Sequence, residues 1–194
     1  MATEQNKSKA MIKKDIIDFL NASAGQIDPK SGKYSCGIIH RTSLVLATSA
    51  KDTPRATVLE FFNEGLTIYI FGEPGGKIAN IRRNAKVSAV IYEQPLDHSK
   101  LQKSLQIFGK AELINVRNNA RLFRSKIRKW NLNTVMNKLM FPLIREMNLP
   151  DEEAEKFLKK GVESLNVIKI SPHHIILKEY HTDFSMKKYE WKKE

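Results

Sequence analysis

The sequence has little of several features that define whole classes of protein. Its single cysteine, Cys36, cannot form an intrachain disulfide and excludes a zinc site built on a cysteine cluster. No apolar run approaches the roughly 18 residues of a membrane-spanning helix, and the first residues, MATEQNKSKA, lack the apolar core of a secretory signal. We therefore expect no membrane association and a cytoplasmic location.

Common catalytic and nucleotide-binding motifs are also missing. No G-x-G-x-x-G occurs, and a Walker A loop would need glycine at Phe71 and Ser or Thr at Ile78. The five histidines are scattered and form no H-E-x-x-H, so no metal site is expected: His40, His98, His173, His174 and His181. Cys36 is near His40 only in sequence, which does not place a base beside a nucleophile, so no catalytic residue is assigned.

Length and composition are those of an ordinary globular protein. Hydrophobic residues make up 41% and charged residues 28% of the chain, which indicates neither disorder nor a membrane protein. A chain of 194 residues is long enough for one full hydrophobic core with an elaboration. We expect one domain over residues 1–194.

The charge is strongly basic, with a formal net charge of +12. From Arg117 to Arg145 the sequence contains basic residues and no acidic one. Such a segment is either a solvated helical face or a surface that binds anions. The sequence alone leaves both interpretations open.

Hydrophobic periodicity predicts a helix, a set of strands, a helical insertion and further strands. Helical spacing of apolar residues is found over 11–20, 77–84 and, with Pro142 expected to kink or break it, over about 117–161. The residues 21–33 are expected to be a loop. Short apolar, β-branched or aromatic runs predict strands at 44–49, 56–62, 66–71, 87–92, 105–114, 167–170 and 175–180.

This order predicts a mainly β, α+β fold in which short antiparallel strands form a small barrel. Closure or near closure of a barrel removes exposed strand edges. The N-terminal helix precedes the barrel, and the helical insertion comes before the last strands.

The stretch LTIYIFGEPGGKIAN, residues 66–80, is the most specific local signal. An apolar run ends in glycines and a lysine, and a helix is expected to begin at once. Main-chain N–H groups at a helix N-terminus, with one ammonium beside them, are suited to hold a phosphate. Lys77 is therefore the predicted anion ligand.

Four sequence blocks together resemble the FMN-binding split-barrel family related to pyridoxamine 5′-phosphate oxidase. They are Asp52-Thr53-Pro54-Arg55, the glycine-lysine loop before a short helix, Asn84-Ala85-Lys86-Val87-Ser88 and Gly109-Lys110-Ala111-Glu112. The likeness covers about residues 38–114 and the closing strands VIKIS and IILKEY. It implies a split β-barrel of the FMN-binding type.

The resemblance also implies a cofactor, an assembly and a set of site residues. It implies a homodimer with one FMN in each of two clefts between the subunits. The implied activity is that of an oxidoreductase or flavin carrier. A small electron donor or acceptor, such as a nicotinamide dinucleotide, would be its partner. The implied flavin contacts are Arg55, Ala56, Thr57 and Val58, the implied phosphate ligands are Gly75, Gly76 and Lys77, and the residues expected to approach the flavin across the sheet are Ser104 and Gln106.

The chain also departs from the oxidase itself. Gly75 and Gly76 stand where that enzyme has a serine and an arginine, and T-V-L-E-F-F stands where it has R-x-V-L-L-K. Its arginine- and tryptophan-rich C-terminal segment is replaced by FSMKKYEWKKE. The resemblance is therefore to a related flavoprotein and not to the true oxidase.

Two other function classes are kept as alternatives. Some split-barrel relatives bind or degrade haem with a histidine, and His173-His174 after Pro172 would be the residues involved. The third hypothesis is a nucleic-acid-binding protein that uses the basic helices around Trp130. It has no recognisable nucleic-acid-binding motif, and net charge alone predicts only non-specific, salt-sensitive affinity.

Overall fold

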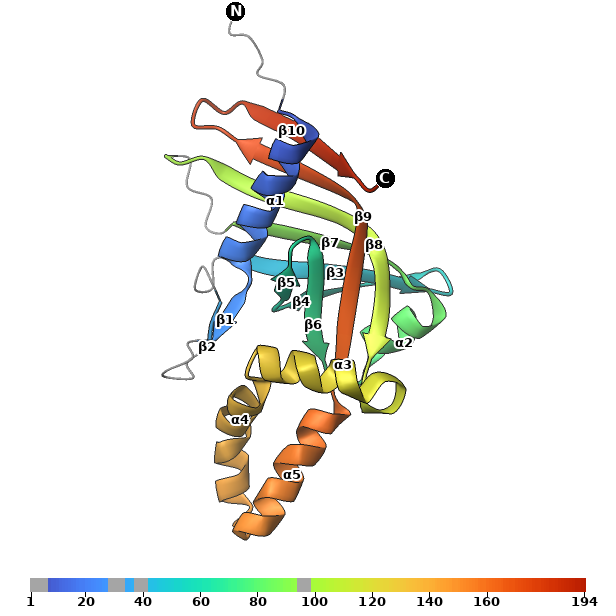
Figure 1. The fold of residues 1–194 in the computed structure, drawn as a ribbon, viewed down its shortest axis with the longest axis vertical. Helices are drawn as coiled ribbons and strands as arrows, with labels where there is room; N and C mark the ends of the chain where they lie inside the picture. Colours follow the sequence, from blue (N-terminus) through green and yellow to red (C-terminus); the bar gives the residue numbers. More distant parts are fainter. Residues whose placement is uncertain (1–6, 28–33, 37–41, 94–98) are drawn as a thin grey trace, which may run out of the picture.

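The computed structural model describes residues 7–27, 34–36, 42–93 and 99–194 (Figure 1). The helices are α1 (Lys9–Ser23), α2 (Gly76–Arg83), α3 (Val116–Lys129), α4 (Leu132–Glu146) and α5 (Asp151–Ser164). The strands are β1 (Gly25–Ile27), β2 (Tyr34–Cys36), β3 (Thr42–Ala50), β4 (Thr53–Leu59), β5 (Phe62–Glu64), β6 (Thr67–Gly72), β7 (Lys86–Glu93), β8 (Gln102–Ile114), β9 (Asn166–Tyr180) and β10 (Met186–Lys192). No helix of this described part has the length and hydropathy needed to cross a bilayer.

One antiparallel sheet organises the fold, in the order β4-β3-β7-β8-β9-β6-β5. The long strand β9 pairs with β8 along its length, with β6 through its first half and with β10 through its second half. The sheet therefore forks at β9 and has β10 as a third edge strand, while the edge strands β4 and β5 follow each other directly in the chain. The predicted α+β split barrel is confirmed.

Strand β9 continues through Pro172, although two separate strands were predicted on either side of this residue. Pro172 pairs with Gly109 at a register shift in the β8–β9 ladder, and a bulge tolerates the missing N–H. A Cβ atom at Gly109 would lie 2.8 Å from the carbonyl oxygen of Ser171, so only glycine permits this close approach. The prediction of a break was therefore wrong.

The concave face of the sheet carries the main core. Alternate residues of the central strands are fully buried there, namely Leu44, Leu46, Ala89, Ile91, Leu105, Ile107, Ile175 and Leu177. Helix α1 covers this face with Ile16 and Leu20, and α2 contributes Ile78 and Ile81. This alternation along each strand leaves the intervening residues on the opposite, outer face of the sheet.

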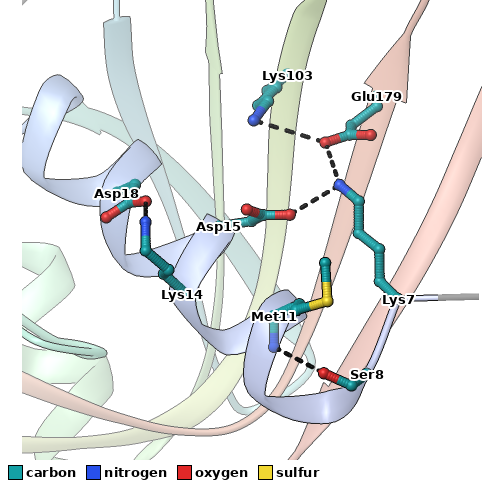
Figure 2. A network of polar contacts seen from close by, with 8 residues as sticks. All are labelled: Lys7, Ser8, Met11, Lys14, Asp15, Asp18, Lys103 and Glu179. Atoms are coloured by element: carbon teal, nitrogen blue, oxygen red, sulfur yellow. Dashed lines mark hydrogen bonds and ion pairs between the residues drawn. The ribbon is translucent and has the colours of Figure 1, made fainter.

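Ion pairs fasten α1 to β9, as Figure 2 shows. Lys7 precedes the N-cap of α1, and its Nζ lies 2.7 Å from Asp15 of that helix and 2.8 Å from Glu179 of β9. Lys103 of β8 lies 3.5 Å from the same Glu179 carboxylate, whose side chain is almost fully buried. A buried carboxylate needs such partners, and these two lysines supply them.

A second core joins the helical insertion to the barrel. Phe123 and Ile127 of α3 pack on Tyr69 and Phe62, and the Trp130 ring stacks on Phe62 at 5.0 Å between centroids. The stripe formed by Phe123, Ile127 and Trp130 is therefore a packing face. Figure 1 shows α4 and α5 continuing away from the barrel as a hairpin.

One local prediction was wrong in part, one of two expected effects of a proline is absent, and one strand was not predicted. The segment 21–33 is not a loop throughout, because α1 continues to Ser23 and β1 follows at once; its residues 28–33 lie outside the described part. Helix α4 runs through Pro142 to Glu146, so the expected break does not occur, although an interior proline removes one main-chain donor. The polar tail forms β10, which alternates too weakly in hydropathy to be recognised as a strand.

Candidate functional site

A tight turn sets the position of the first predicted site residue. Lys51 and Asp52 both have positive φ, at 51° and 57°, which is the geometry of the two-residue turn between twisted strands. The turn fixes the pairing of β3 with β4 so that Arg55 lies opposite Thr48. Residues paired in an antiparallel ladder share a face, so Arg55 lies on the face that α2 covers.

One side chain of α2 and one of its C-cap residue, Asn84, lock the helix onto β3. Asn80 Nδ2 donates to Thr48 Oγ1 at 3.2 Å, and Asn84 Nδ2 donates to the Ser49 carbonyl oxygen at 3.1 Å. At the other end the N-cap, Gly75, provides no side-chain hydrogen bond, and the first turn contains no acidic residue. The N–H groups of this first turn are thus left for another acceptor.

Two glycines make room for two cations at this helix start. A Cβ atom at Gly76 would lie 2.7 Å from both Cζ and Nε of Arg55, so the guanidinium occupies the place of a side chain there. A Cβ atom at Gly72 would lie 2.9 Å from Cε of Lys77. We call Arg55, Gly72, Gly76 and Lys77 the anion cradle. Within the described residues, neither cation forms an ion pair.

A pocket of about 340 Å³ opens beside the cradle. Val58 and Leu59 of β4, Gly72 at the end of β6 and Lys77 form one side of it. Helix α4 forms an apolar wall with Leu132, Val135 and Met136, and the acidic residues at the pocket are Glu60 and Glu73. The helical insertion therefore reaches the predicted site, which its sequence did not indicate.

Ser104 and Gln106 lie elsewhere, in a pocket of about 610 Å³ on the outer face of β7, β8 and β9. One row of paired residues, Val58, Val45, Val90 and Gln106, runs across the sheet from β4 to β8. Three strand spacings separate its ends, or about 14 Å. The structure therefore separates the predicted residues into two groups, with Arg55, Ala56, Thr57, Val58, Gly75, Gly76 and Lys77 in one and Ser104 and Gln106 in the other.

The outer face between these two groups is apolar and open. Val58 is 67% exposed and Val90 39% exposed, and Tyr180 and Phe184 are exposed at the second pocket. Strand β4 is an edge of the sheet, so on one side its main-chain N–H and C=O groups have no strand partner among the described residues. Ala56 and Val58 thus lie where main-chain groups and an apolar surface are both accessible.

The histidines are not gathered into a site within the described residues. His173 is exposed, whereas His174 stacks on Phe108 and its Nε2 lies 3.1 Å from Glu190. His181 lines the outer-face pocket, and its Nε2 is buried without a hydrogen-bond partner there. His40 and His98 lie outside the described part. In that part no three His, Cys, Asp or Glu side chains are grouped to hold a metal ion.

The anion cradle fits a phosphate monoester. Arg55 supplies a planar fork of donors, Lys77 supplies a compact positive charge, and the start of α2 supplies unpaired N–H groups. The resemblance implied Gly76 and Lys77 as phosphate ligands and Arg55 as a contact of the flavin, whereas the structure places the Arg55 guanidinium at Gly76, beside the start of α2. Gly72 and the α4 wall were not predicted. The sequence did carry a signal for Gly72, because glycine is uncommon within a strand and here it stands at the end of the apolar run, directly before Glu73.

Comparisons with known proteins agree with this architecture. The model of the family described as pyridoxamine 5′-phosphate oxidase matches residues 33–177, about three quarters of the chain. No curated protein sequence matches. Among solved structures, PhzG from Burkholderia lata 383, in complex with tetrahydrophenazine-1-carboxylic acid, is similar with a TM-score of 0.50 and 15% identity, over 78% of this chain and 76% of that chain.

Two further solved structures are more distant in geometry. General Stress Protein 26 from Bacillus anthracis str. Sterne is 16% identical over 92% of this chain and 98% of its own, with a TM-score of 0.45. A FAD-binding protein from Mesorhizobium loti is 18% identical over 72% of this chain and 86% of its own, with a TM-score of 0.44. At these identities the similarity concerns the fold alone.

Proposed function

The chain belongs to the pyridoxamine 5′-phosphate oxidase family, and on that premise we propose that it is an FMN-binding oxidoreductase. The observation that carries the proposal is the anion cradle, in which Arg55 and Lys77 occupy the space left by Gly76 and Gly72. When bound, FMN supplies the redox chemistry. The protein's own residues bind the cofactor, orient it and exclude water.

Each group of site residues has a separate task in this proposal. Arg55 and Lys77 hold the phosphate, together with the main-chain N–H groups that follow Gly75. The free edge of β4 at Ala56, Thr57 and Val58 offers main-chain donors and acceptors to the polar rim of the flavin ring. In place of the oxidase's arginine- and tryptophan-rich C-terminal segment this chain has FSMKKYEWKKE, so we propose a substrate other than pyridoxamine phosphate.

A second copy of the chain is needed to bring Ser104 and Gln106 to the flavin. The two groups of residues lie about 14 Å apart on one protomer, and the apolar outer face separates them. Covering exposed apolar surface with another subunit is favourable. We therefore propose a homodimer that packs through this face, with one cofactor cleft at each end of the interface.

The direct test is a titration of purified protein with FMN, followed by visible absorption and flavin fluorescence. We expect perturbed flavin bands and saturable binding, with one FMN for each chain. FAD and haem are titrated in parallel, the latter followed by its Soret band. Tighter binding of FAD would change the identity of the cofactor, and binding of haem but not flavin would refute the proposal.

The interface makes a separate prediction. Val90→Asp is expected to convert a dimer into a monomer and to reduce FMN affinity at least tenfold, because a carboxylate would be buried in an apolar contact. Size-exclusion chromatography with light scattering measures the mass, and fluorescence titration measures the affinity.

Leu143→Asp is the matched control for this variant. The exposed fraction of Leu143 is 42%, similar to the 39% of Val90. Leu143 lies on α4 of the insertion and not on the sheet. The control is expected to stay dimeric and to keep FMN affinity. A monomeric wild-type protein, or a dimeric Val90→Asp variant, would contradict the proposed interface.

A further inference from the structure

Helix α3 directs its positive charges to two sides. Lys126 and Lys129 turn toward the sheet, where both ammonium groups lie 2.6 Å from the Glu64 carboxylate. Arg124 and Arg128 are exposed on another face, one helical turn apart. No ion pair joins either arginine to an acidic residue of the described part. Two strong, permanent cations therefore lie one helical turn apart with no ion-pair partner in the described part.

These two arginines border a pocket of about 470 Å³ enclosed by α3, α4 and α5. Its floor is apolar, with Phe123 and Ile127 from α3 and Leu158 and Val162 from α5. Phe123 is 1% exposed and Val162 9% exposed, so the floor belongs to the second core and is well fixed. Pockets of several hundred Å³ with an apolar lining and a few polar groups are typical of small-molecule sites.

The charges around the pocket favour an anion on the α3 side. Arg124, Arg128 and Lys159 line it together with Glu155 and Glu163, so the positive charges exceed the negative ones by one. Both carboxylates belong to α5, whereas the two guanidinium groups belong to α3. Guanidinium groups about 6 Å apart along a helix can hold the oxygens of one carboxylate or phosphate between them.

We propose that the pocket between α3, α4 and α5 binds a small amphipathic anion, a carboxylate or phosphate carried on an apolar body. Arg124 and Arg128 bind the charged group, and the apolar body lies on Phe123, Ile127 and Leu158. This site is separate from the anion cradle, shares no lining residue with the pocket beside Lys77, and does not depend on flavin binding.

The test uses the full-length protein and three ligands with the same alkyl chain. Isothermal titration calorimetry compares octanoate, octyl phosphate and 1-octanol, so that the two acids reveal which anionic group is preferred and the alcohol measures the apolar contribution. We expect both acids to bind with one site for each chain, and the alcohol at least tenfold more weakly. The double variant Arg124→Gln/Arg128→Gln is expected to lose at least tenfold in affinity for the acids.

Arg121→Gln is the matched control, because Arg121 is an exposed arginine of the same helix that does not line the pocket. It is expected to bind octanoate as the wild type does. Equal binding of 1-octanol, unchanged affinity in the double variant, or an equal loss in Arg121→Gln would overturn the proposal. Tight binding of a single-stranded oligonucleotide that needs Arg121 as much as Arg124 and Arg128 would instead identify a polyanion surface.

Discussion

Replacing Lys77 by alanine is expected to weaken FMN binding about ten- to a hundredfold and to leave riboflavin binding unchanged. The Lys77 side chain leaves the first turn of α2 and passes over Gly72 at the end of β6, so its ammonium is expected to meet the phosphate and not the ring. A charge-assisted hydrogen bond contributes about 1.5–3 kcal/mol, which corresponds to this range of affinity. Fluorescence titration of both ligands with wild type and variant measures the effect.

Riboflavin makes this experiment specific because it lacks only the phosphate. Lys110→Ala removes the same charge from an exposed position on β8 and is expected to change neither affinity. Arg55→Ala should resemble Lys77→Ala, and the double variant should lose less than the sum, since both cations bind one phosphate. If FMN and riboflavin bind Lys77→Ala as they bind the wild type, the cradle does not hold the phosphate.

Gly76→Ala tests the geometry of the cradle without removing a charge. The new methyl group would meet the guanidinium of Arg55, which is the mobile end of a long side chain, so the fold should tolerate the change. The displaced Arg55 should bind phosphate less well, and FMN affinity should fall severalfold at constant melting temperature. Gly75→Ala, where a Cβ would meet nothing within 4 Å, is the matched control for contact with Arg55.

Local sequence patterns were enough to find most of the barrel. Strands β3, β6, β7 and β8 are rich in β-branched and aromatic residues, and glycine or Asn-Glu-Gly turns separate several of them. Helix α2 was recognisable because the glycines stop a strand directly before apolar residues at helical spacing. Strand β10 was missed because its exposed side chains, MKKYEWK, carry charges in place of a clear apolar alternation.

The geometry of the site depends on contacts that no local pattern encodes. Arg55 reaches Gly76 only because the turn at Lys51 and Asp52 fixes the register of β4 and because Asn80 pins α2 to β3. The wall that α4 adds beside Lys77 comes from residues more than fifty positions later in the chain. Those residues have the spacing of an ordinary packing stripe, so their sequence did not distinguish a pocket wall from a core.

The contact of Glu64 with the helical insertion is another long-range feature, and it should dominate the acid stability of the protein. Lys126 is only 8% exposed, and its Nζ lies 2.6 Å from the Glu64 carboxylate. Tyr69 Oη donates a hydrogen bond to the same carboxylate at 2.9 Å. Burial alone would raise the pKa of Glu64, but the hydrogen bonds from Lys126, Lys129 and Tyr69 lower it to about 2. The same burial, together with the bond to Glu64, raises the pKa of Tyr69.

Glu64→Gln is therefore expected to reduce the free energy of unfolding by about 2–4 kcal/mol at pH 7, because it leaves the buried Lys126 without its counter-charge. Glu152→Gln, which breaks the exposed pair with Lys156, is the control and should cost less than about 0.5 kcal/mol. Urea denaturation followed by circular dichroism measures both changes. A loss in Glu64→Gln as small as in the control would show that the insertion does not depend on this contact.

The pH dependence gives the same contact a second test with a definite sign. The folded pKa of Glu64 is about 2 and lies below the ordinary value of 4.5, so its stabilisation is complete above pH 4.5 and is lost as the pH falls toward 2. The difference between these values corresponds to at most about 3–4 kcal/mol. The gap in unfolding free energy between wild type and Glu64→Gln should close over this interval. A gap that stays constant from pH 6 to 2 would mean that the pKa of Glu64 is the same in the folded and the unfolded protein, so that the two lysines do not stabilise its ionised form.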